Sequence, residues 1–274
     1  MSGAQALPNR SWRHGNAPAD GRRDLPQETP IAMVHDATTT AVMMATPADL
    51  EDFGLGFSLT EGIVERAADI RSIEIAHGPL GAEVRMWLNH DRGEALTARR
   101  RHLAGPTGCG LCGIDSLTEA ARPPRAVTAE LTLTPADIQA ALAALREQQT
   151  LNAVTRAVHA AGFWTPADWL LAAREDVGRH NALDKLVGAL SRREATPPGA
   201  VVLTSRVSVE MVQKSAVLGS PVIIAVSAPT ALAVRMADEA GITLIAIARD
   251  DGFEVFTHPR RVANTADRQG AVRP

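Results

Sequence analysis

Residues 201–249 read VVLTSRVSVEMVQKSAVLGSPVIIAVSAPTALAVRMADEAGITLIAIAR. Three short apolar runs alternate in this stretch with two segments whose apolar residues recur at helical spacing. The pattern predicts strands at 201–204, 221–226 and 242–248, and helices at 207–218 and 230–240. Such alternation is typical of an α/β architecture, with a mostly parallel sheet covered by helices on both faces.

The flanking segments extend this pattern. A buried strand is expected at Trp169–Ala173, a helix at Ala182–Ser191 and a final edge strand at Phe253–Phe256. Ligands of parallel sheets bind beyond the carboxyl ends of the strands, where helix N-termini suit phosphate groups. Four polar segments are expected at those ends, namely 175–181, 205–206, 227–230 and 249–251.

Residues 175–185, EDVGRHNALDK, crowd charged and polar side chains into one strand-to-helix junction. One interpretation is a capped helix start whose charges pair with one another. The other is a ligand site, because charges at a strand end face the usual crevice. The roles of Asp176 and His180 stay open between these interpretations. Arg206, Arg235 and Arg249 are candidates for contacts with phosphate groups, and their individual roles are open as well.

The N-terminal half is expected to form a smaller α+β unit. Strands are predicted at 31–34 and 39–45, and a hairpin from 73–75 and 84–88. A helix is predicted to follow Thr46, with this residue as N-cap, and to end near Glu61. Further candidate positions are Pro47 at the helix start, Gly54 and Gly56 at a close packing contact, and Gly62 after the helix.

A second helix is expected to start at Thr134-Pro135-Ala136-Asp137, again with a threonine as N-cap and a proline as first residue. The apolar residues of this helix lie on one face. The domain boundaries expected from these patterns are a disordered leader at 1–25, an N-terminal α+β domain at 26–130, and an α/β domain at 131–274. The leader is rich in Gly, Pro and Arg and has no apolar core, which disfavours a signal peptide.

Composition limits the classes of function. The 274 residues are 45% hydrophobic, which is enough for a sizeable core, and the formal net charge is −3. This charge gives no strong attraction to nucleic acid or to an anionic membrane. Aromatic residues make up 3% and Tyr is absent, which disfavours stacking on single-stranded nucleic acid. No apolar run is long enough to cross a bilayer, so we expect a cytoplasmic protein without membrane or nucleic-acid partners.

The chain has only two cysteines, Cys109 and Cys112, set among glycines in GPTGCGLCG at 105–113. A structural zinc site needs four ligands and no histidine has finger-like spacing, so no metal is expected. A thioredoxin-like dithiol belongs at a strand-to-helix turn, and a zinc deaminase needs His-x-Glu, which this chain lacks. A reactive thiol in a Gly-rich loop at 90–124 remains, with the basic run 99–102 favouring the thiolate.

Six ordered motifs resemble the FdhD family of formate dehydrogenase accessory sulfurtransferases, over nearly the whole chain after the leader. They are GFSLTEGIV (56–64), GCGLCG (108–113), AVHAAGF (157–163), EDVGRHNALDKLVG (175–188), LTSRVSVEMVQKSAVLGSPVI (203–223) and SAPTALAVRMADEAGITLIAIAR (227–249). The resemblance implies a cytidine-deaminase-like three-layer C-terminal domain, a smaller N-terminal α+β domain and a homodimer.

The resemblance also implies a function. A cysteine desulfurase would pass sulfur to a persulfide on Cys109, with Cys112 as second thiol, for delivery to bis-molybdopterin guanine dinucleotide of formate dehydrogenase. The family's cofactor-binding stretch matches six positions here, namely Ala248, Arg249, Asp250, Asp251, Gly252 and Phe253. A cofactor chaperone that moves no sulfur and a CxxC redox regulator remain alternatives.

Three residues depart from the family pattern. Pro106 stands where a basic residue is expected, and Glu254 and Phe256 stand where Asn and Tyr are usual. These differences affect the detailed contacts with the cofactor rather than the class of protein.

Overall fold

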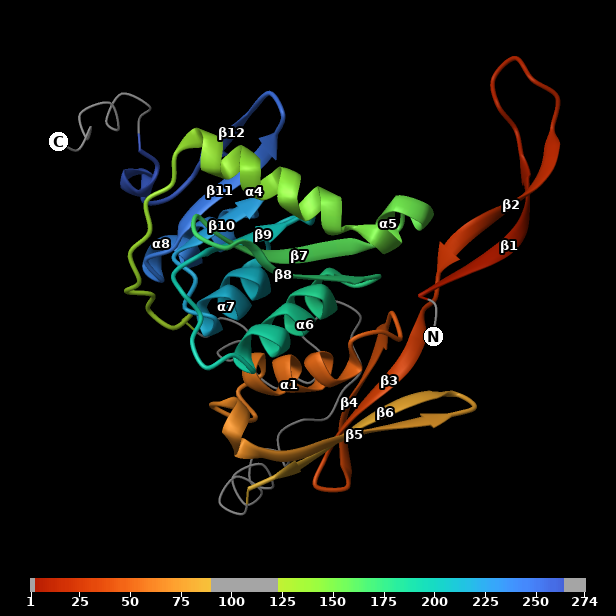
Figure 1. Cartoon of the computed structure of the whole chain (residues 1–274), viewed down its shortest axis with the longest axis horizontal. Helices are drawn as coiled ribbons and strands as arrows, with labels where there is room; N and C mark the ends of the chain where they lie inside the picture. Colours follow the sequence, from red (N-terminus) through yellow and green to blue (C-terminus); the bar gives the residue numbers. More distant parts are fainter. Residues whose placement is uncertain (1–2, 90–122, 264–274) are drawn as a thin grey trace.

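The computed structural model describes residues 3–89 and 123–263 (Figure 1). Within them the chain forms sheets of two, four and six strands together with helices. The predicted loop at 90–124, which carries Cys109 and Cys112, lies outside the described residues except for its last two positions. The mixture of sheets and helices confirms the expectation of an α/β C-terminal part and an α+β N-terminal part, which together make an α+β protein.

The largest sheet has the strand order β12-β11-β10-β9-β7-β8. The strands are β7 (His159–Thr165), β8 (Trp169–Asp176), β9 (Ala200–Leu203), β10 (Val222–Ala225), β11 (Thr243–Arg249) and β12 (Gly252–Val255). Strands β9, β10 and β11 are parallel, whereas β7 is antiparallel to β8 and β9, and β12 is antiparallel to β11. The prediction of a mostly parallel sheet is therefore wrong. Short turns join β7 to β8 and β11 to β12, and such turns can connect only antiparallel neighbours.

The strand predictions at this end of the sheet also need correction. No strand is predicted at β7, because its Ala and Gly residues have low strand propensity. Since β7 takes the place beside β9, β8 becomes the edge strand. The strand predicted at Trp169–Ala173 is confirmed as part of β8, but its predicted burial is wrong, since Trp169 is 61% exposed and the next four residues are half-buried.

Helices cover both faces of this sheet (Figure 1). They are α4 (Pro135–Gln148) on one face, and α6 (Arg179–Ser191), α7 (Val209–Val217) and α8 (Ala231–Glu239) on the other. A separate apolar cluster fills the space on each side. The expected three-layer arrangement is therefore confirmed. The start of α4 is also confirmed, because Thr134 Oγ1 accepts a hydrogen bond from Asp137 N at 3.2 Å.

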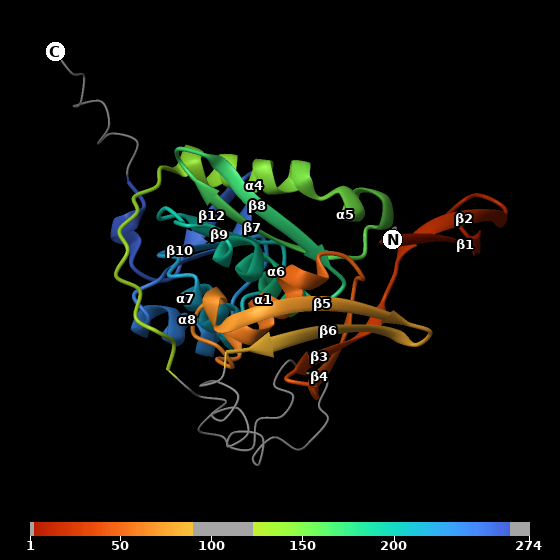
Figure 2. The ribbon, with the colours of Figure 1, turned by 60° about the horizontal axis from the view of Figure 1, so that its bottom comes forward.

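The N-terminal unit has a four-stranded sheet in the order β4-β3-β6-β5. Its strands are β3 (Thr29–His35), β4 (Thr38–Ala45), β5 (Ile70–Gly78) and β6 (Gly81–Leu88), with a 3-10 turn, η1 (Ala67–Asp69), before β5. The predicted strands and the β5–β6 hairpin are confirmed. Helix α1 (Leu50–Thr60) lies between this sheet and α6, so it joins the two units (Figures 1 and 2).

Close packing of α1 depends on two glycines, as predicted. A methyl group on Gly54 would overlap Cγ1 of Val84 in β6. A methyl group on Gly56 would overlap the backbone carbonyl of Asp184 in α6. Helix α1 therefore contacts β6 at Gly54 and the backbone of α6 at Gly56, and neither position has room for a side chain.

The predicted start of α1 is wrong by several residues. The helix begins at Leu50 after Asp49, whose φ of 53° is in the left-handed region, and no side chain caps it. Thr46 does not act as N-cap, because its backbone N–H and its hydroxyl bond to residues 176 and 177 of the other unit. The predicted C-terminal end is confirmed, with Gly62 at φ 67° just after the helix.

The N-terminal leader is not disordered where the structure describes it. Strands β1 (Ala4–Ser11) and β2 (Ala19–Pro26) pair antiparallel in a hairpin that projects from the body (Figures 1 and 2). Nearly all of its residues are exposed, so composition indicated correctly that they join no core, but it did not reveal their backbone pairing. The domain boundary at residue 130 stays a prediction.

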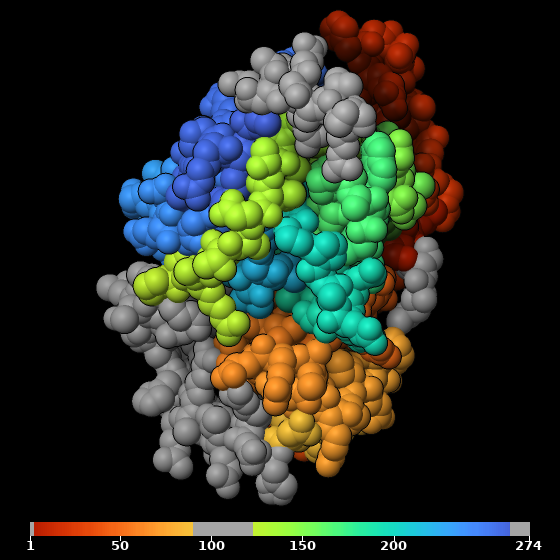
Figure 3. All heavy atoms as spheres, turned by 60° about the vertical axis from the view of Figure 1, so that its left-hand side comes forward, coloured from red at the N-terminus to blue at the C-terminus, as the bar shows by residue number. Residues whose placement is uncertain are grey.

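The segment from Pro123 to Thr134 crosses the surface between the orange N-terminal unit and the blue C-terminal elements (Figure 3). Val127 N donates to Ala240 O at 2.8 Å, and Leu133 pairs with Val262 just after η2 (Pro259–Arg261). Backbone hydrogen bonds thus hold this connection against the larger unit.

Candidate functional site

The carboxyl ends of four strands lie along one edge of the large sheet. Two successive antiparallel pairings, of β8 with β7 and of β7 with β9, give β8 the same direction as β9, β10 and β11. The polar segments after these strands therefore meet at one edge, as predicted, although the sheet is not mostly parallel. The segments after β9 and β10 touch directly, since Val207 N donates to Ala228 O and Thr230 N to Val207 O.

Part of the 175–185 segment is structural. Asp176 and Lys185 are fully buried, with Nζ 2.6 Å from Oδ2. Asp176 also accepts hydrogen bonds from Asn181 Nδ2, Gly178 N and Thr46 N at 2.8–2.9 Å. Each of the two carboxylate oxygens thus accepts hydrogen bonds from two donors. The paired-charge interpretation is therefore correct for these residues.

A second buried ion pair joins α6 to α7 and to the end of α1. Lys214 Nζ lies 2.8 Å from Asp184 Oδ1 and 2.9 Å from Thr60 Oγ1, and Glu61 lies 3.3 Å away. Burial opposes the charged ammonium, but the carboxylates of Asp184 and Glu61 outweigh it and raise the pKa of Lys214. This pair also stabilises the contact between the two units.

Removing Lys185 should cost much of the stability, because it leaves the Asp176 carboxylate buried without a counter-charge. We expect Lys185→Met to lower the free energy of unfolding by about 3–5 kcal/mol in urea titrations. As a control, Arg192→Met breaks the exposed pair with Glu51 and a 3.4 Å pair with Asp52, which keeps Arg174 as its partner, so it should cost less than about 1 kcal/mol. Equal effects of the two substitutions would contradict this account.

Four side chains at the same edge are not part of those networks. Ser208 Oγ donates to Glu210 Oε2 at 2.6 Å, and His180 Nε2 lies 3.8 Å from the same oxygen. The interaction with His180 and the Ser208 hydrogen bond, against the effect of burial, lower the pKa of Glu210 to about 2. Burial, together with the charges of Arg179 and His180, lowers the pKa of His159 at the start of β7, and Asp176 opposes this shift.

The stretch predicted to bind the cofactor forms the turn between β11 and β12. Ala248 is buried, whereas Arg249, Asp250 and Asp251 are exposed. Asp250 Oδ1 lies 2.8 Å from Arg146 Nη2 of α4, in an exposed ion pair. Asp251 therefore offers the less engaged carboxylate. The last two positions of the stretch are Gly252, which has a φ of 150°, and half-buried Phe253, which packs on the apolar cluster under α4.

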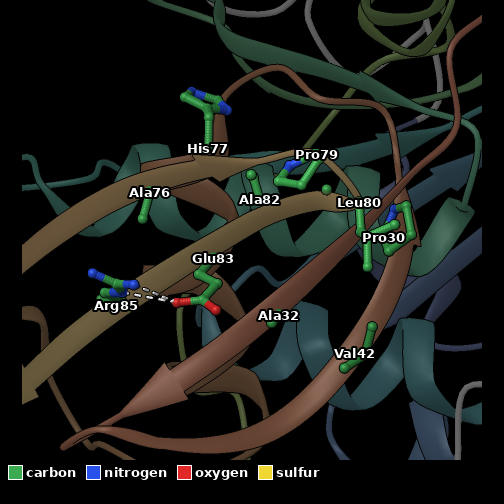
Figure 4. A pocket seen from close by; sticks show the side chains of 12 residues that line it. Pro30, Ala32, Val42, Ala76, His77, Pro79, Leu80, Ala82, Glu83 and Arg85 are labelled. Carbon is green, nitrogen blue, oxygen red and sulfur yellow. Dashed lines mark hydrogen bonds and ion pairs between the residues drawn. The ribbon is translucent and has the colours of Figure 1, made fainter.

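A groove of about 330 Å³ lies elsewhere, on the face of the four-stranded sheet that α1 leaves open (Figure 4). Its floor and rim are largely apolar, with Val42 61% and Leu80 87% exposed. The side chains of Arg85 and Glu83 pair with each other at 2.8 Å. The charges in this groove are thus mutually neutralised, unlike those at the strand ends.

The expectation of no metal is not decided by the structure. In residues 3–89 and 123–263 no group of three or more His, Cys, Asp or Glu is arranged to hold an ion. Cys109 and Cys112 lie outside these ranges, so the expectation stays a prediction. Among the helices of the described part, none is long and apolar enough to cross a membrane.

Comparison with known proteins identifies the family. The model of the FdhD/NarQ family matches residues 26–263. The sulfur carrier protein FdhD of Agrobacterium fabrum is 53% identical over 247 residues, covering 89% of this chain and 91% of that protein. The FdhD protein of Cupriavidus necator is 48% identical over 257 residues, covering 93% and 88%.

A solved structure agrees. A protein from Desulfotalea psychrophila, described as a formate dehydrogenase accessory protein, superposes with a TM-score of 0.73 at 26% identity and covers 95% of this chain and 99% of its own. The N-terminal hairpin lies almost entirely before the family match, which begins at residue 26. The match spans both the α1 unit and the large sheet, and the chain therefore belongs to the FdhD/NarQ family.

Proposed function

We propose that this protein is a cytoplasmic sulfur carrier that serves formate dehydrogenase. It takes sulfur from a cysteine desulfurase as a persulfide on Cys109 and transfers it to bis-molybdopterin guanine dinucleotide before the cofactor is inserted. The observation that carries the proposal is that relatives about half identical over nine-tenths of the chain are named sulfur carrier proteins. A homodimer is also expected.

The chemistry at Cys109 is an exchange at sulfur. Its thiolate attacks the terminal sulfur of the desulfurase persulfide, one S–S bond forms, and the S–S bond of the donor breaks. The desulfurase cysteine leaves as a thiolate, and no net oxidation or reduction occurs. Four glycines between residues 105 and 113 keep bulk away from both thiols, which suits a cysteine that meets a donor and then an acceptor.

Intact mass spectrometry tests this step directly. After incubation with a cysteine desulfurase and free cysteine, the protein should gain the mass of one sulfur atom, which a reductant removes. Cys112→Ala should still gain the atom, and Cys109→Ala should not. A cofactor chaperone would show no gain, and a redox regulator would instead lose two hydrogen atoms as the pair forms a disulfide.

The strand-end edge is proposed to hold the guanine part of the cofactor. Helix N-termini and exposed arginines suit its phosphates, and the carboxylate of Asp251 can accept hydrogen bonds from the guanine N1 and N2 positions. Asp250 is less available because Arg146 already binds it. The stretch from Ala248 to Phe253 thus supplies a suitable polar edge beside the sheet.

GDP should therefore bind more tightly than ADP, because adenine leaves the carboxylate without donors. The unmade hydrogen bonds correspond to about 1–3 kcal/mol, or roughly 5–150-fold in affinity. Calorimetry should show this preference shrinking in Asp251→Asn and unchanged in Asp24→Asn, an exposed aspartate on the hairpin. Equal binding of GDP and ADP by the unmodified protein would place guanine recognition elsewhere.

A further inference from the structure

We propose that Arg179, His180 and His159 form a binding site for a phosphate-type oxyanion, between the start of β7 and the N-termini of α6 and α7. The three side chains come from one strand and one helix that meet at the strand-end edge. The inference rests on the proposed function only for the source of the oxyanion, which would be the phosphates of a guanine nucleotide.

The unpaired guanidinium of Arg179 is the main observation. Four arginines in the described part of the chain are buried or half-buried, namely Arg85, Arg174, Arg179 and Arg261. The other three bind carboxylates or carbonyls, although Arg261 also has a buried Nε without a hydrogen bond. Arg179 alone of the four has neither a hydrogen bond nor an ion pair, and its Nε is buried without a partner. Buried polar groups are normally satisfied, so an orphan of this kind indicates a missing ligand.

Two imidazoles lie at the same edge as Arg179 and can supply further hydrogen-bond donors. His180 Nε2 is buried and makes no hydrogen bond in the described structure, because Glu210 is 3.8 Å away. Burial, followed by the charges of Arg179 and His180, lowers the pKa of His159, so its imidazole is neutral near pH 7. A neutral imidazole still offers one N–H donor, so both histidines can hydrogen-bond to an anion that pairs with the Arg179 guanidinium.

The neighbouring carboxylates cannot supply that anion. Asp176 in β8 pairs with His159 in the neighbouring strand β7. Its carboxylate already binds Lys185, Asn181 and two backbone N–H groups. Glu210 accepts the hydroxyl of Ser208 and lies 3.8 Å from His180 Nε2, and it makes no ion pair with Arg179. No carboxylate of the described residues therefore binds the Arg179 guanidinium, which leaves it available to a ligand.

The start of α6 contributes further donors. This helix of 13 residues begins at Arg179, and no side chain caps it. Carboxylates bind the first amides of two other helices, since Glu175 accepts from the start of α5 (Thr150–Thr155) and Asp137 closes the capping box of α4. Helices α1 and α7 resemble α6 in having no side-chain cap. Arg179 is the first residue of α6 and so belongs to this uncapped helix N-terminus, and helix N-termini favour phosphate groups.

The position fits a nucleotide that also reaches the β11–β12 turn. Glu210 follows β9 and His159 begins β7, which lie two and three strands from β11. At the usual spacing of strands, these distances are roughly 10–14 Å. A nucleotide whose base lies at Asp251 can therefore extend its phosphates along the edge toward Arg179.

Calorimetry with inorganic pyrophosphate tests the site without using the guanine base or the cysteines. We expect Arg179→Gln to weaken pyrophosphate binding by at least about tenfold, since a charged hydrogen bond is lost. Arg193→Gln is the matched control, because Arg193 is exposed at the other end of α6. Unchanged pyrophosphate affinity in Arg179→Gln, or no binding by the unmodified protein, would overturn the proposal.

Two further readouts separate the alternatives. Arg179→Gln should leave the thermal midpoint of the ligand-free protein unchanged or higher, because it removes an unpaired buried charge; a lower midpoint with full pyrophosphate affinity would show a purely structural role. A parallel loss of GDP affinity, with the GDP-to-ADP ratio retained, would assign the site to nucleotide phosphates. Loss of pyrophosphate binding alone would assign it to a free oxyanion. Failure of sulfur loading at Cys109 would affect neither result.

Discussion

Replacing Cys109 with alanine is expected to abolish activation of formate dehydrogenase in a host that depends on this protein. The variant has no thiol at the position that matches the family's persulfide cysteine, so it can neither accept nor pass on sulfur. Enzyme activity in extracts, set against the amount of soluble variant protein, measures the effect. Full activity of Cys109→Ala would refute the sulfur-carrier mechanism.

Cys112→Ala is the matched control, because it removes the other thiol of the same Gly-rich segment. We expect a smaller loss, since Cys112 resolves or protects the persulfide and does not carry the transferred atom. Arg179→Gln should be an intermediate case, with sulfur loading intact and delivery to the cofactor impaired. The order of the three activities thus separates loading of sulfur from its delivery.

Among glycine-to-alanine substitutions in the described part of the chain, Gly56→Ala is expected to lower the free energy of unfolding most. The added Cβ would overlap the carbonyl of Asp184, a backbone atom that cannot move away without displacing α6. Overpacking of this kind costs about 1–3 kcal/mol and more where the backbone must shift, so we expect about 3–5 kcal/mol. Urea unfolding followed by circular dichroism measures the loss.

The control for this substitution is Gly78→Ala at the end of β5. A Cβ there would meet only Gly81 O at an ordinary van der Waals distance. The change should therefore be within about 0.5 kcal/mol. If Gly56→Ala proved as mild as Gly78→Ala, α1 and α6 would have to lie farther apart than the structure places them.

Gly54 and Gly56 of α1 show how far a local sequence pattern predicts packing. A glycine inside a helical pattern lowers helix propensity, and the sequence keeps two of them in α1, so a close contact is a sound prediction. The pattern does not say that Gly54 meets a strand and Gly56 meets a helix. That distinction depends on the position of α1 between a sheet and α6, which is set by contacts far apart in the chain.

The sequence by itself determined the alternating order of β9 to β11 with their helices, the cap of α4, the strands of the N-terminal unit and the family, because each depends on local periodicity or on short motifs. Only the tertiary structure decided the antiparallel place of β7 and the roles within residues 175–185. Asp176 and Lys185 became structural because they are buried against Thr46, some 130 residues earlier, whereas Arg179 was left unpaired at the edge. The local sequence shows which groups carry charge. Burial and contacts with residues far away in the sequence decide which charges are neutralised and which remain available to a ligand.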